Sequence, residues 1–338
     1  MLPQKYGITA NFQAMGDINV KVYHGYGHTH NLVLYGHVFK NKAVVQKQYT
    51  TRVFTNIIHL LRLFFVKPLL RVKVRLYWQD ESFETLTEDD GFFKFEWQSG
   101  QEITAGWHPV KVACIGKEEE VVATGEGKVY VPHSTQYIFI SDIDDTVMVS
   151  YSATRFRRLR ELLIRNPRTR QQFAKVSDWY GRLANAHTHA ATPNPFFYVS
   201  SSEWNLYDYL LEFFRFNKLP EGIFLLNQIK RWYQLFSTGK TKHAGKLLRI
   251  ARILDVFPKQ QFVLIGDNSQ HDPDIYTSIA AKYPQKIFAI YIRNVRPPKE
   301  ALTSKTLLAA EEAGVHTFLF TGSEEATAHG QTIGLIGI

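Results

Sequence analysis

The segment Tyr137-Ile-Phe-Ile-Ser-Asp142-Ile-Asp144-Asp145-Thr146 decides the fold class of this 338-residue chain. Its apolar half is typical of a strand covered on both faces, yet it ends in a group of carboxylates. Four further apolar runs follow, at Phe196 to Val199, Ile223 to Leu226, Phe262 to Ile265 and Ile287 to Ile292. Longer helical patterns separate them, and this alternation predicts a parallel sheet with helices on both faces. Residues 136–322 are therefore expected to form an α/β domain.

The carboxylates at the end of the first strand indicate a metal site. Ligands of parallel α/β sheets bind beyond the carboxyl ends of the strands, which is where Asp142 stands. Asp144 would point to the same side if the chain continues extended. Neighbouring carboxylates repel and burial raises their pKa values, so they need a cation or a shared proton. Mg2+ prefers such oxygen ligands. The alternative is that Asp144-Asp145-Thr146 only caps a turn.

A second apolar strand also ends in an acidic turn. It consists of Phe262-Val-Leu-Ile-Gly266-Asp267, and Asp272 follows five residues later. Two strand ends of this kind can face one crevice. Gly266 would permit a sharp exit from the strand, since glycine tolerates unusual backbone angles. Asp267 is placed to supply a metal carboxylate and Asp272 to support it, which favours a metal site over a turn cap.

Two segments between these strands offer groups for a phosphoryl substrate. Phe196-Phe-Tyr-Val-Ser200-Ser201-Ser202 is a strand that ends in hydroxyls. A cationic helical pattern, Lys240 to Leu254, can place one ammonium near the carboxylates. Taken singly, such serines usually form a loop and such lysines a solvated helix face. It is their order along the chain, together with the two acidic strand ends, that favours a phosphoryl-binding role.

The order of an Asp-x-Asp-x-Thr strand, a Ser-ended strand, a Lys helix and a Gly-Asp-x4-Asp strand resembles the haloacid dehalogenase superfamily of phosphohydrolases. This resemblance implies that Asp142 is the nucleophile and Asp144 the general acid and then base. It implies that Ser200 and Lys246 hold the phosphoryl group. The implied ligands of Mg2+ are Asp142, Asp144, Asp267 and Asp272. Such an aspartyl-phosphate splits one displacement into two steps.

Longer motifs are similar to the actin-patch-type phosphatidate phosphatases of fungi and their bacterial relatives. They are Asp142 to Thr146, Tyr198 to Tyr207 and Ile265 to Tyr276, together with Tyr23 to Gly27 and Tyr291 to Val295. The resemblance implies a phosphatidate substrate. The residues assigned to substrate binding are Thr146, Ser201 and Trp204, although packing on the next helix is the alternative for Trp204. Gly245 stands where histidine is usual, so Lys242 is the second choice after Lys246. Glu203 and Asn268 also depart from the pattern, which leaves the lipid substrate open.

From Asp17 to about His133 the pattern changes to short strands. The candidates are Ile18 to Tyr23, Leu32 to Phe39, Val72 to Trp78, Phe92 to Trp97, Val110 to Cys114 and Val121 to Val131. Residues 1–135 are therefore predicted to be a β-sandwich, immunoglobulin-like or transthyretin-like, with one helix over Arg52 to Phe65. That helix packs on the sandwich or, alternatively, lies on a membrane surface. Residues 323–338 are weakly patterned and are expected to be a weakly ordered tail.

The charge balance favours anionic partners. Lys and Arg number 40 against 31 Asp and Glu, a net charge of +9. A basic helical insert is expected at 151–190. Its cations are Arg155, Arg157, Arg158, Arg160, Arg165, Arg168, Arg170 and Lys175. They would attract anionic lipid headgroups or simply form a solvated face. Because aromatic and basic residues do not interleave, no specific nucleic-acid partner is predicted.

The expected location is the cytoplasm, with peripheral membrane contact. We see no signal sequence, no apolar run long enough to span a bilayer, and one cysteine, Cys114, in an apolar run typical of a core. The predicted function is Mg2+-dependent hydrolysis of a phosphomonoester through an aspartyl-phosphate, converting phosphatidate to diacylglycerol at a membrane surface. The alternatives are the same chemistry on a soluble phosphoester, or a non-catalytic protein that binds anionic surfaces. The oligomeric state stays open.

Overall fold

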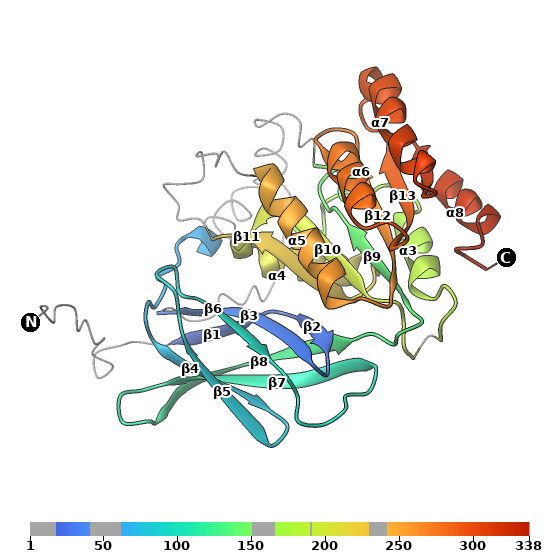
Figure 1. The fold of residues 1–338 in the computed structure, drawn as a ribbon. Coiled ribbons are helices and arrows are strands. Elements are labelled where there is room, and N and C mark those ends of the chain that lie inside the picture. Colours follow the sequence, from blue (N-terminus) through green and yellow to red (C-terminus); the bar gives the residue numbers. More distant parts are fainter. Residues whose placement is uncertain (1–17, 41–61, 151–165, 190, 230–241, 338) are drawn as a thin grey trace, which may run out of the picture. The chain divides into compact units, whose positions relative to one another are not determined.

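The computed structural model describes residues 18–40, 62–150, 166–189, 191–229 and 242–337 (Figure 1). The chain divides into two compact units. One contains Val66–Gly100, Trp107–Val129 and the strands before residue 45, and the other contains Tyr130–Ile338 with two short earlier segments. One division falls after Val129, and the domain boundary expected at residue 135 remains a prediction. The helix expected over Arg52 to Phe65 falls almost wholly outside the described residues.

The first unit is built on antiparallel strands. These are β1 (Asn19–Val22), β2 (Gly25–His28), β3 (Asn31–Phe39), β4 (Lys73–Trp78), β5 (Glu81–Leu86), β6 (Phe92–Trp97), β7 (Gly106–Ile115) and β8 (Val121–Val131). They follow the order β1-β3-β2-β8-β7-β4-β5, and β6 pairs with β3. All six expected strand regions are strands. The sequence patterns missed β2, which is short and glycine-rich, and β5, whose residues are mostly exposed.

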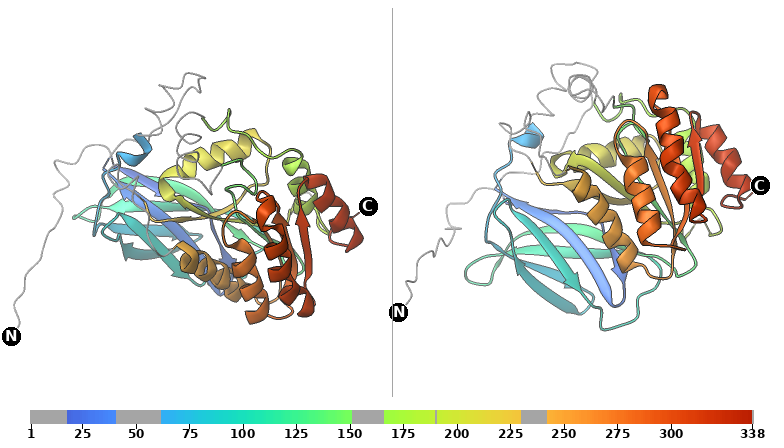
Figure 2. Two further views of the ribbon diagram at one scale, coloured as in Figure 1. Left: turned by 90° about the horizontal axis from the view of Figure 1, so that it is seen from above. Right: turned by 45° about the horizontal axis from the view of Figure 1, so that its top comes forward.

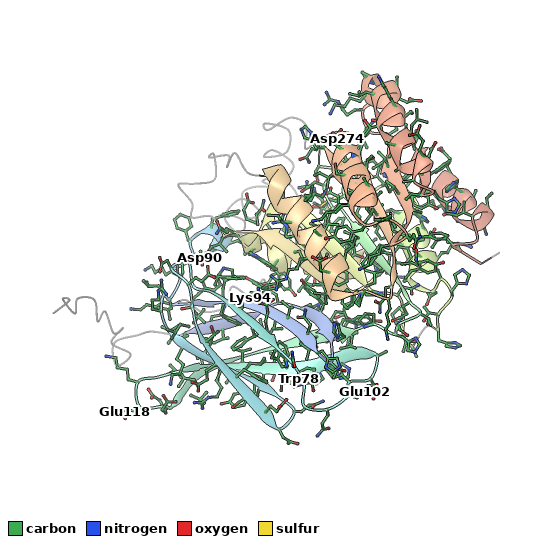
Figure 3. All side chains as sticks on the ribbon, viewed as in Figure 1. Trp78, Asp90, Lys94, Glu102, Glu118 and Asp274 are labelled. Atoms are coloured by element: carbon green, nitrogen blue, oxygen red, sulfur yellow. The ribbon has the colours of Figure 1, made fainter. Side chains whose placement is uncertain are left out.

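Alternation of buried and exposed residues explains the packing of the first unit. Along β4 every second side chain is buried, as expected for a strand with one face in a core. The Trp78 ring, labelled in Figure 3, is fully buried and meets the Trp97 ring edge-on at 5.5 Å. The Trp78 indole N–H donates to Ser99 Oγ at 3.2 Å. Cys114 is buried, as expected of a core residue, and burial raises the pKa of its thiol to about 11.

The second unit contains the expected parallel sheet. Its strands are β9 (Tyr137–Ser141), β10 (Phe196–Glu203), β11 (Gly222–Asn227), β12 (Gln261–Asp267), β13 (Ile287–Arg293) and β14 (His316–Phe320). They follow the order β11-β10-β9-β12-β13-β14, and every pairing is parallel. Five of these strands were predicted. The edge strand β14 was missed because it is short and mostly half-exposed, so it has no continuous buried run.

Helices cover both faces of this sheet (Figures 1 and 2). They are α3 (Val176–Ala184), α4 (Tyr207–Phe216), α5 (Lys242–Val256), α6 (Asp272–Lys282), α7 (Glu300–Glu312) and α8 (Ser323–Thr332). Strands proceed outward from β9 to β11 and, in the other direction, from β12 to β14. Right-handed crossovers therefore put α3 and α4 on one face and α5, α6 and α7 on the other. The strand order reverses between β9 and β12, and crevices form at such a point.

The expectation of a weakly ordered tail from Ser323 is wrong, because this segment forms α8. The Glu325 carboxylate accepts hydrogen bonds from the backbone N–H groups of Thr321 and Gly322, both at 3.2 Å, and so caps the helix. Ser323 is buried, and its hydroxyl donates to Ala174 O at 2.9 Å. The helix packs through small residues, which leave little hydrophobic periodicity in the sequence.

The expected basic helical insert is also different in its described part. The structure describes it from Asn166, and between Asn166 and Lys175 the described residues form no helix, whereas Val176–Ala184 form α3. Asn166 Oδ1 accepts the N–H groups of Arg168 and Thr169 at 2.9 and 3.0 Å, so the chain turns here instead of continuing as a helix. Residues 151–165 lie outside the described part of the chain. Among the described helices, none has the length and apolar character to cross a bilayer.

Candidate active site

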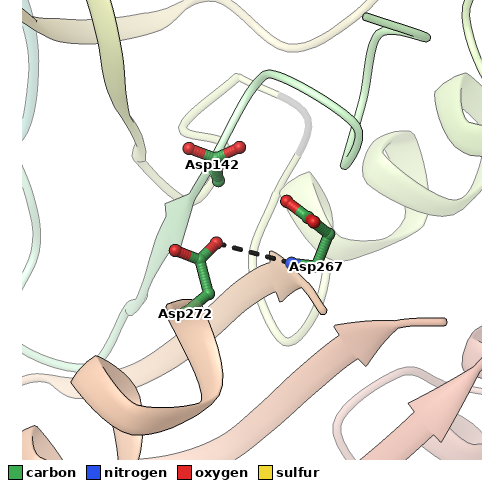
Figure 4. A group of neighbouring side chains, drawn as sticks. All are labelled: Asp142, Asp267 and Asp272. Atoms are coloured by element: carbon green, nitrogen blue, oxygen red, sulfur yellow. Dashed lines mark hydrogen bonds between the residues drawn. The ribbon is translucent and has the colours of Figure 1, made fainter. Parts of the chain in front are cut away.

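The carboxyl ends of β9 and β12 bring three aspartates together (Figure 4). Asp142 directly follows β9, Asp267 is the last residue of β12, and Asp272 is the first residue of α6. One carboxylate oxygen from each lies within 4.8 Å of the others, and all three side chains are buried. We call these residues the acidic triad. Asp142 is held in register because its N–H donates to Ile265 O of β12 at 2.8 Å.

Gly266 has a different role from the expected sharp exit. It lies within β12 and is not among the glycines with a positive φ. A Cβ at this position would overlap the Asp272 carboxylate and come within 2.8 Å of the Tyr276 ring. Glycine therefore lets the first turn of α6 approach β12 closely. This approach allows Asp272 Oδ2 to accept the Asp267 N–H at 3.4 Å, the contact drawn in Figure 4.

A lysine of α5 stands between two members of the triad. Lys246 Nζ is 2.8 Å from Asp142 Oδ1 and 2.5 Å from Asp272 Oδ1. Burial by itself would lower the pKa of Lys246, but the Asp142 and Asp272 carboxylates outweigh it and raise this pKa above its ordinary value. Lys246 is therefore a fixed cation in the site. The side chain of Lys242, the second choice from sequence, lies outside the described part of the structure.

One ammonium does not balance three buried carboxylates. Burial, opposed by Lys246, raises the pKa of Asp142 well above its ordinary value, and Asp272, Asp267 and Asp144 add to the rise. Burial and the Asp272 charge raise the pKa of Asp267 to about 7. Asp142 Oδ2 is buried and has no hydrogen-bond partner among the described residues. Such an orphaned oxygen in an excess of negative charge is what a divalent cation would satisfy, so the residues present fit a metal ion.

Asp144 lies apart from the acidic triad. Its Oδ2 accepts hydrogen bonds from Ser200 Oγ at 3.3 Å and from Ser202 Oγ at 3.2 Å. Beyond Ile143 the chain turns back, with the N–H groups of Val147 and Met148 both donating to Ile143 O at 3.0 Å. Within this turn Asp145 has a φ of 63°, which lies in the left-handed region. The role of Asp144 as a fourth metal ligand therefore remains a prediction, and its observed partners are the serines.

The three serines of β10 divide between two sides of the strand. Ser200 and Ser202 both reach Asp144, and the Ser202 N–H also donates to Ser200 Oγ at 2.9 Å. Ser201 is partly exposed, and its carbonyl oxygen accepts from Asn227 Nδ2 at 3.0 Å. Sequence reasoning selected Ser200 and Ser201 and missed Ser202. The alternation of side chains along a strand was the signal that pairs Ser200 with Ser202.

The other two residues assigned to substrate binding are buried. Thr146 Oγ1 donates to Asp267 Oδ2 at 3.5 Å, so Thr146 contacts the acidic triad. Trp204 opens a short 3-10 helix, η2 (Trp204–Leu206), and its ring centroid lies 6.0 Å from that of Tyr207. Tyr207 in turn meets Phe224 edge-on at 5.8 Å. This arrangement favours the packing alternative for Trp204.

Arg293 is a site-supporting residue that had no role in the sequence reasoning. Its buried guanidinium donates to Thr146 O at 3.1 Å, to Thr321 O at 2.9 Å and to Ser323 Oγ at 3.1 Å. The rings of Phe173 and Phe320 lie 4.3 and 4.7 Å from it. Burial lowers the pKa of Arg293 to about 10. The sequence feature that could have identified Arg293 was the motif Tyr291 to Val295, in which an arginine ends a buried strand.

Residues 137–294 match the family model described as "Phosphatidate phosphatase APP1, catalytic domain". This segment is similar to the APP1 catalytic-domain family. Over 156 residues the chain is 35% identical to Phosphatidate phosphatase APP1 of Saccharomyces cerevisiae, covering 46% of this chain and 25% of that protein. Over 180 residues it is 31% identical to the uncharacterized protein C29B5.04c of Schizosaccharomyces pombe, covering 53% and 28%. The chain thus spans about a quarter of the length of these curated relatives.

The solved structures offer only a weak likeness. A carbohydrate acetylesterase from Xanthomonas citri, XAC1771, is 7% identical with a TM-score of 0.35, covering 94% of this chain and 75% of that one. That score is too low to relate the two folds. The matched APP1-type segment contains the acidic triad, the serines of β10 and Lys246, so the family match and the geometry coincide on the same residues.

Ser202→Ala in the APP1-type domain is expected to lower kcat about tenfold while KM stays within about twofold, because Asp144 loses one of the hydroxyls that orient it. Ser201→Ala is the matched control. The Ser201 side chain is not among those that contact Asp144, so kcat should stay within about twofold, whereas a rise in KM would support the substrate contact predicted from the sequence. Steady-state phosphate release measures both variants. Equal effects of the two substitutions would contradict the separate roles inferred for these serines.

Without metal, the APP1-type domain is expected to lose stability as the pH rises from about 4 to about 7. The folded state holds protons on Asp267 that the unfolded chain, with a pKa near 3.8, has already released. His37 lies in the first unit, where burial lowers its pKa to about 3, so that unit should show the opposite trend below pH 6.5. Urea unfolding in EDTA should therefore compare the wild type with Asp267→Asn. The difference in unfolding free energy should change with pH, and a constant difference would contradict the raised Asp267 pKa.

Proposed function

We propose that this protein is a Mg2+-dependent phosphatidate phosphatase that acts through an aspartyl-phosphate on Asp142. The observation that carries the proposal is the buried acidic triad beside Lys246, in which one oxygen of Asp142 has no partner among the described residues. The match of residues 137–294 to the APP1 catalytic domain supports phosphatidate as the substrate. The name of the yeast relative supports it as well.

Asp142 is suited to the role of nucleophile. Its Oδ1 is held by Lys246, while its buried Oδ2 has no hydrogen bond with any described residue. The Asp142 carboxylate is therefore the group that attacks phosphorus, and the bond from phosphorus to the glycerol oxygen breaks. Lys246 is fixed between Asp142 and Asp272 before substrate arrives, so its charge can stabilise the transferring phosphoryl group without reorganisation.

Asp144 is suited to proton transfer. The hydroxyls of Ser200 and Ser202 both donate to its Oδ2, and these two hydrogen bonds fix the orientation of the carboxyl group. In the first step Asp144 gives a proton to the glycerol oxygen that leaves as diacylglycerol. In the second step water attacks phosphorus, Asp144 takes the proton of that water, and Asp142 is released with inorganic phosphate.

The residues that would hold a metal ion are Asp142 and Asp267, with Asp272 in support. Asp272 accepts hydrogen bonds from Lys246 and from the Asp267 N–H, so it holds these two residues in position. Thr146 reaches Asp267 Oδ2 from the loop after β9. When bound, Mg2+ would supply positive charge against the phosphoryl oxygens. The metal affinity should rise with pH, since Asp267 must first lose its proton.

The proposal includes finer statements about the fold. We infer that the APP1-type domain is a haloacid-dehalogenase-like, Rossmannoid domain, supported by its all-parallel sheet with Asp142 and Asp267 at the ends of adjacent strands. We infer that the first unit is a β-sandwich. Its support is β4, in which every second residue is buried, as expected of a strand with one face in a core and the other face solvated.

The proposed place of action is the cytoplasmic face of a membrane. Phosphatidate resides in bilayers, and a net charge of +9 favours an anionic surface. The same active-site geometry would also hydrolyse a soluble phosphoester, which is the second candidate function. The third, a non-catalytic protein that binds anionic surfaces, does not require the acidic triad or its lysine.

The experiment that tests the proposal measures phosphate release from vesicles containing phosphatidate and from a soluble aryl phosphate, with Mg2+ and with EDTA. We expect Mg2+-dependent release from both, faster on vesicles, and abolition by EDTA. Release from the aryl phosphate alone would keep the chemistry and reject the lipid. Absence of metal-dependent release from either substrate would reject the phosphatase assignment in favour of surface binding.

A further inference from the structure

Arg170 is a buried cation that the proposed phosphatase chemistry does not use. Its side chain is 4% exposed, and Nη2 donates to Ser150 Oγ at 3.0 Å. Its Nε and Nη1 are buried and form no hydrogen bond with the described residues. A buried guanidinium is ordinarily paired with a carboxylate, and unsatisfied N–H groups are unfavourable in an interior. The arrangement is therefore incomplete without a further acceptor.

Arg170 is attached to the loop that carries the candidate nucleophile. Val149 N–H donates to Gln171 O at 3.0 Å, and Phe173 N–H donates to Val147 O at 3.2 Å, so the two segments run side by side. Ser150, the partner of Arg170, also donates its N–H to Asp145 Oδ1 at 2.8 Å. Asp145 belongs to the same turn as Asp142. The guanidinium is thus linked to this turn through a single residue.

The backbone around Arg170 holds its side chain in place. The N–H of Arg170 donates to Asn166 O at 3.0 Å, closing a tight turn. Asn166 Oδ1 fixes the same turn by accepting the N–H groups of Arg168 and Thr169. A cation positioned before its ligand arrives loses less conformational entropy on binding. A preorganised side chain of this kind is typical of a ligand-binding residue.

Arg168, two residues earlier, provides the contrast. Its guanidinium is largely outside the core and donates to Glu212 Oε1 at 2.7 Å. It also lies 5.8 Å from the Phe216 ring. Arg168 is therefore engaged by an ion pair, whereas Arg170 is buried and has hydrogen-bonding capacity left. The two arginines form a natural pair of test and control.

We propose that Arg170 binds a phosphate oxyanion, either the headgroup of a lipid substrate or free inorganic phosphate. A guanidinium offers several N–H groups in one plane and matches phosphate oxygens, which accept more than one of them. Oxyanion binding would satisfy Nε and Nη1 and neutralise the buried charge. The lipid source rests on the proposed function, whereas binding of inorganic phosphate does not.

The first arm of the test needs no catalysis. Inorganic phosphate is titrated in EDTA while the thermal unfolding midpoint is followed for the wild type, Arg170→Met and Arg168→Met. Phosphate should raise the midpoint of the wild type and of Arg168→Met, and the apparent Kd should weaken at least about tenfold in Arg170→Met. If Arg170→Met does not fold, Arg170→Gln, which stays polar but loses the charge, is measured in its place with the same expectation.

The second arm identifies the source of the phosphate. With Mg2+ and phosphatidate vesicles, a lipid headgroup at Arg170 predicts that Arg170→Met raises KM about tenfold, with kcat within about threefold. A site for free phosphate predicts an unchanged KM and an inhibition constant for inorganic phosphate that is weaker by about tenfold. If phosphate binding, KM and inhibition all match the wild type, the proposal is overturned. An inactive wild type would reject the proposed function, while the EDTA titration would still decide on Arg170.

Discussion

Asp142→Asn is expected to lower phosphate release by about 10^4-fold or more, because the amide nitrogen or oxygen cannot replace the attacking carboxylate. The rest of the acidic triad should stay in place, since asparagine has the same shape. The substitution also removes a buried carboxyl whose pKa is raised by burial, against the effect of Lys246, and further by the neighbouring aspartates. Release from phosphatidate vesicles with Mg2+ measures the effect, and acid quenching of the reaction tests whether a covalent phosphoenzyme forms.

Asp274→Asn is the matched control for Asp142→Asn. Asp274 lies in the first turn of α6, and its side chain is 65% exposed (Figure 3). The activity of the Asp274→Asn variant should stay within about twofold of the wild type, as for most surface substitutions. Thermal unfolding establishes that both variants fold. A folded Asp142→Asn that keeps activity, or a wild type that traps phosphate on another residue, would remove Asp142 from the role of nucleophile.

Lys246→Met is expected to destabilise the metal-free protein at pH 7.5 by about 3–5 kcal/mol, because it leaves buried carboxylates without their counter-charge. It should also lower kcat by about 10^2-fold or more, since no ammonium then faces the transferring phosphoryl group. Urea unfolding in EDTA gives the free energy. Part of the loss should return at lower pH, where the Asp142 and Asp267 carboxyls, whose pKa values are raised, take up protons.

Lys305→Met controls for the removal of a lysine as such, since Lys305 lies on an exposed position of α7. It should change stability by no more than about 0.5 kcal/mol. The double variant Lys246→Met/Asp272→Asn tests whether the unpaired Asp272 carboxylate causes the loss of stability in Lys246→Met. Because Asp272 accepts from Lys246 at 2.5 Å, removing both charges should recover part of the stability lost in Lys246→Met. Additive losses would mean that the two residues do not act as an ion pair.

The chemistry-bearing residues of the site were largely evident from local patterns. Asp142 and Asp267 each end a continuous apolar run, and parallel strands present such ends at one edge of a sheet. Lys246 followed from a resemblance in motif order, and the structure places its ammonium against Asp142. By contrast, the contact of Asp144 with Ser200 and Ser202 was not predicted, because it depends on how the end of β9 packs beside the end of β10.

Residues whose contacts lie far away in the sequence could not be identified from local sequence patterns. Arg293 reaches Thr146 and Ser323, which are far from it in the sequence, and α8 packs through small residues without a strong periodicity. Arg170 was counted among surface cations of a basic helical segment. Burial distinguishes it from Arg168, an arginine of the same segment that is paired with Glu212.

By itself, the sequence determined the class of the second unit, the strands of its sheet and the positions of Asp142, Asp267 and Lys246. Hydrophobic periodicity and turn chemistry are local properties, and parallel strands have a predictable edge. Only the tertiary structure decided which hydroxyls orient Asp144, why Gly266 is required and which arginine is buried. Those properties depend on which segments, remote in the chain, pack against one another, and no local pattern encodes the desolvation of a side chain by its distant neighbours.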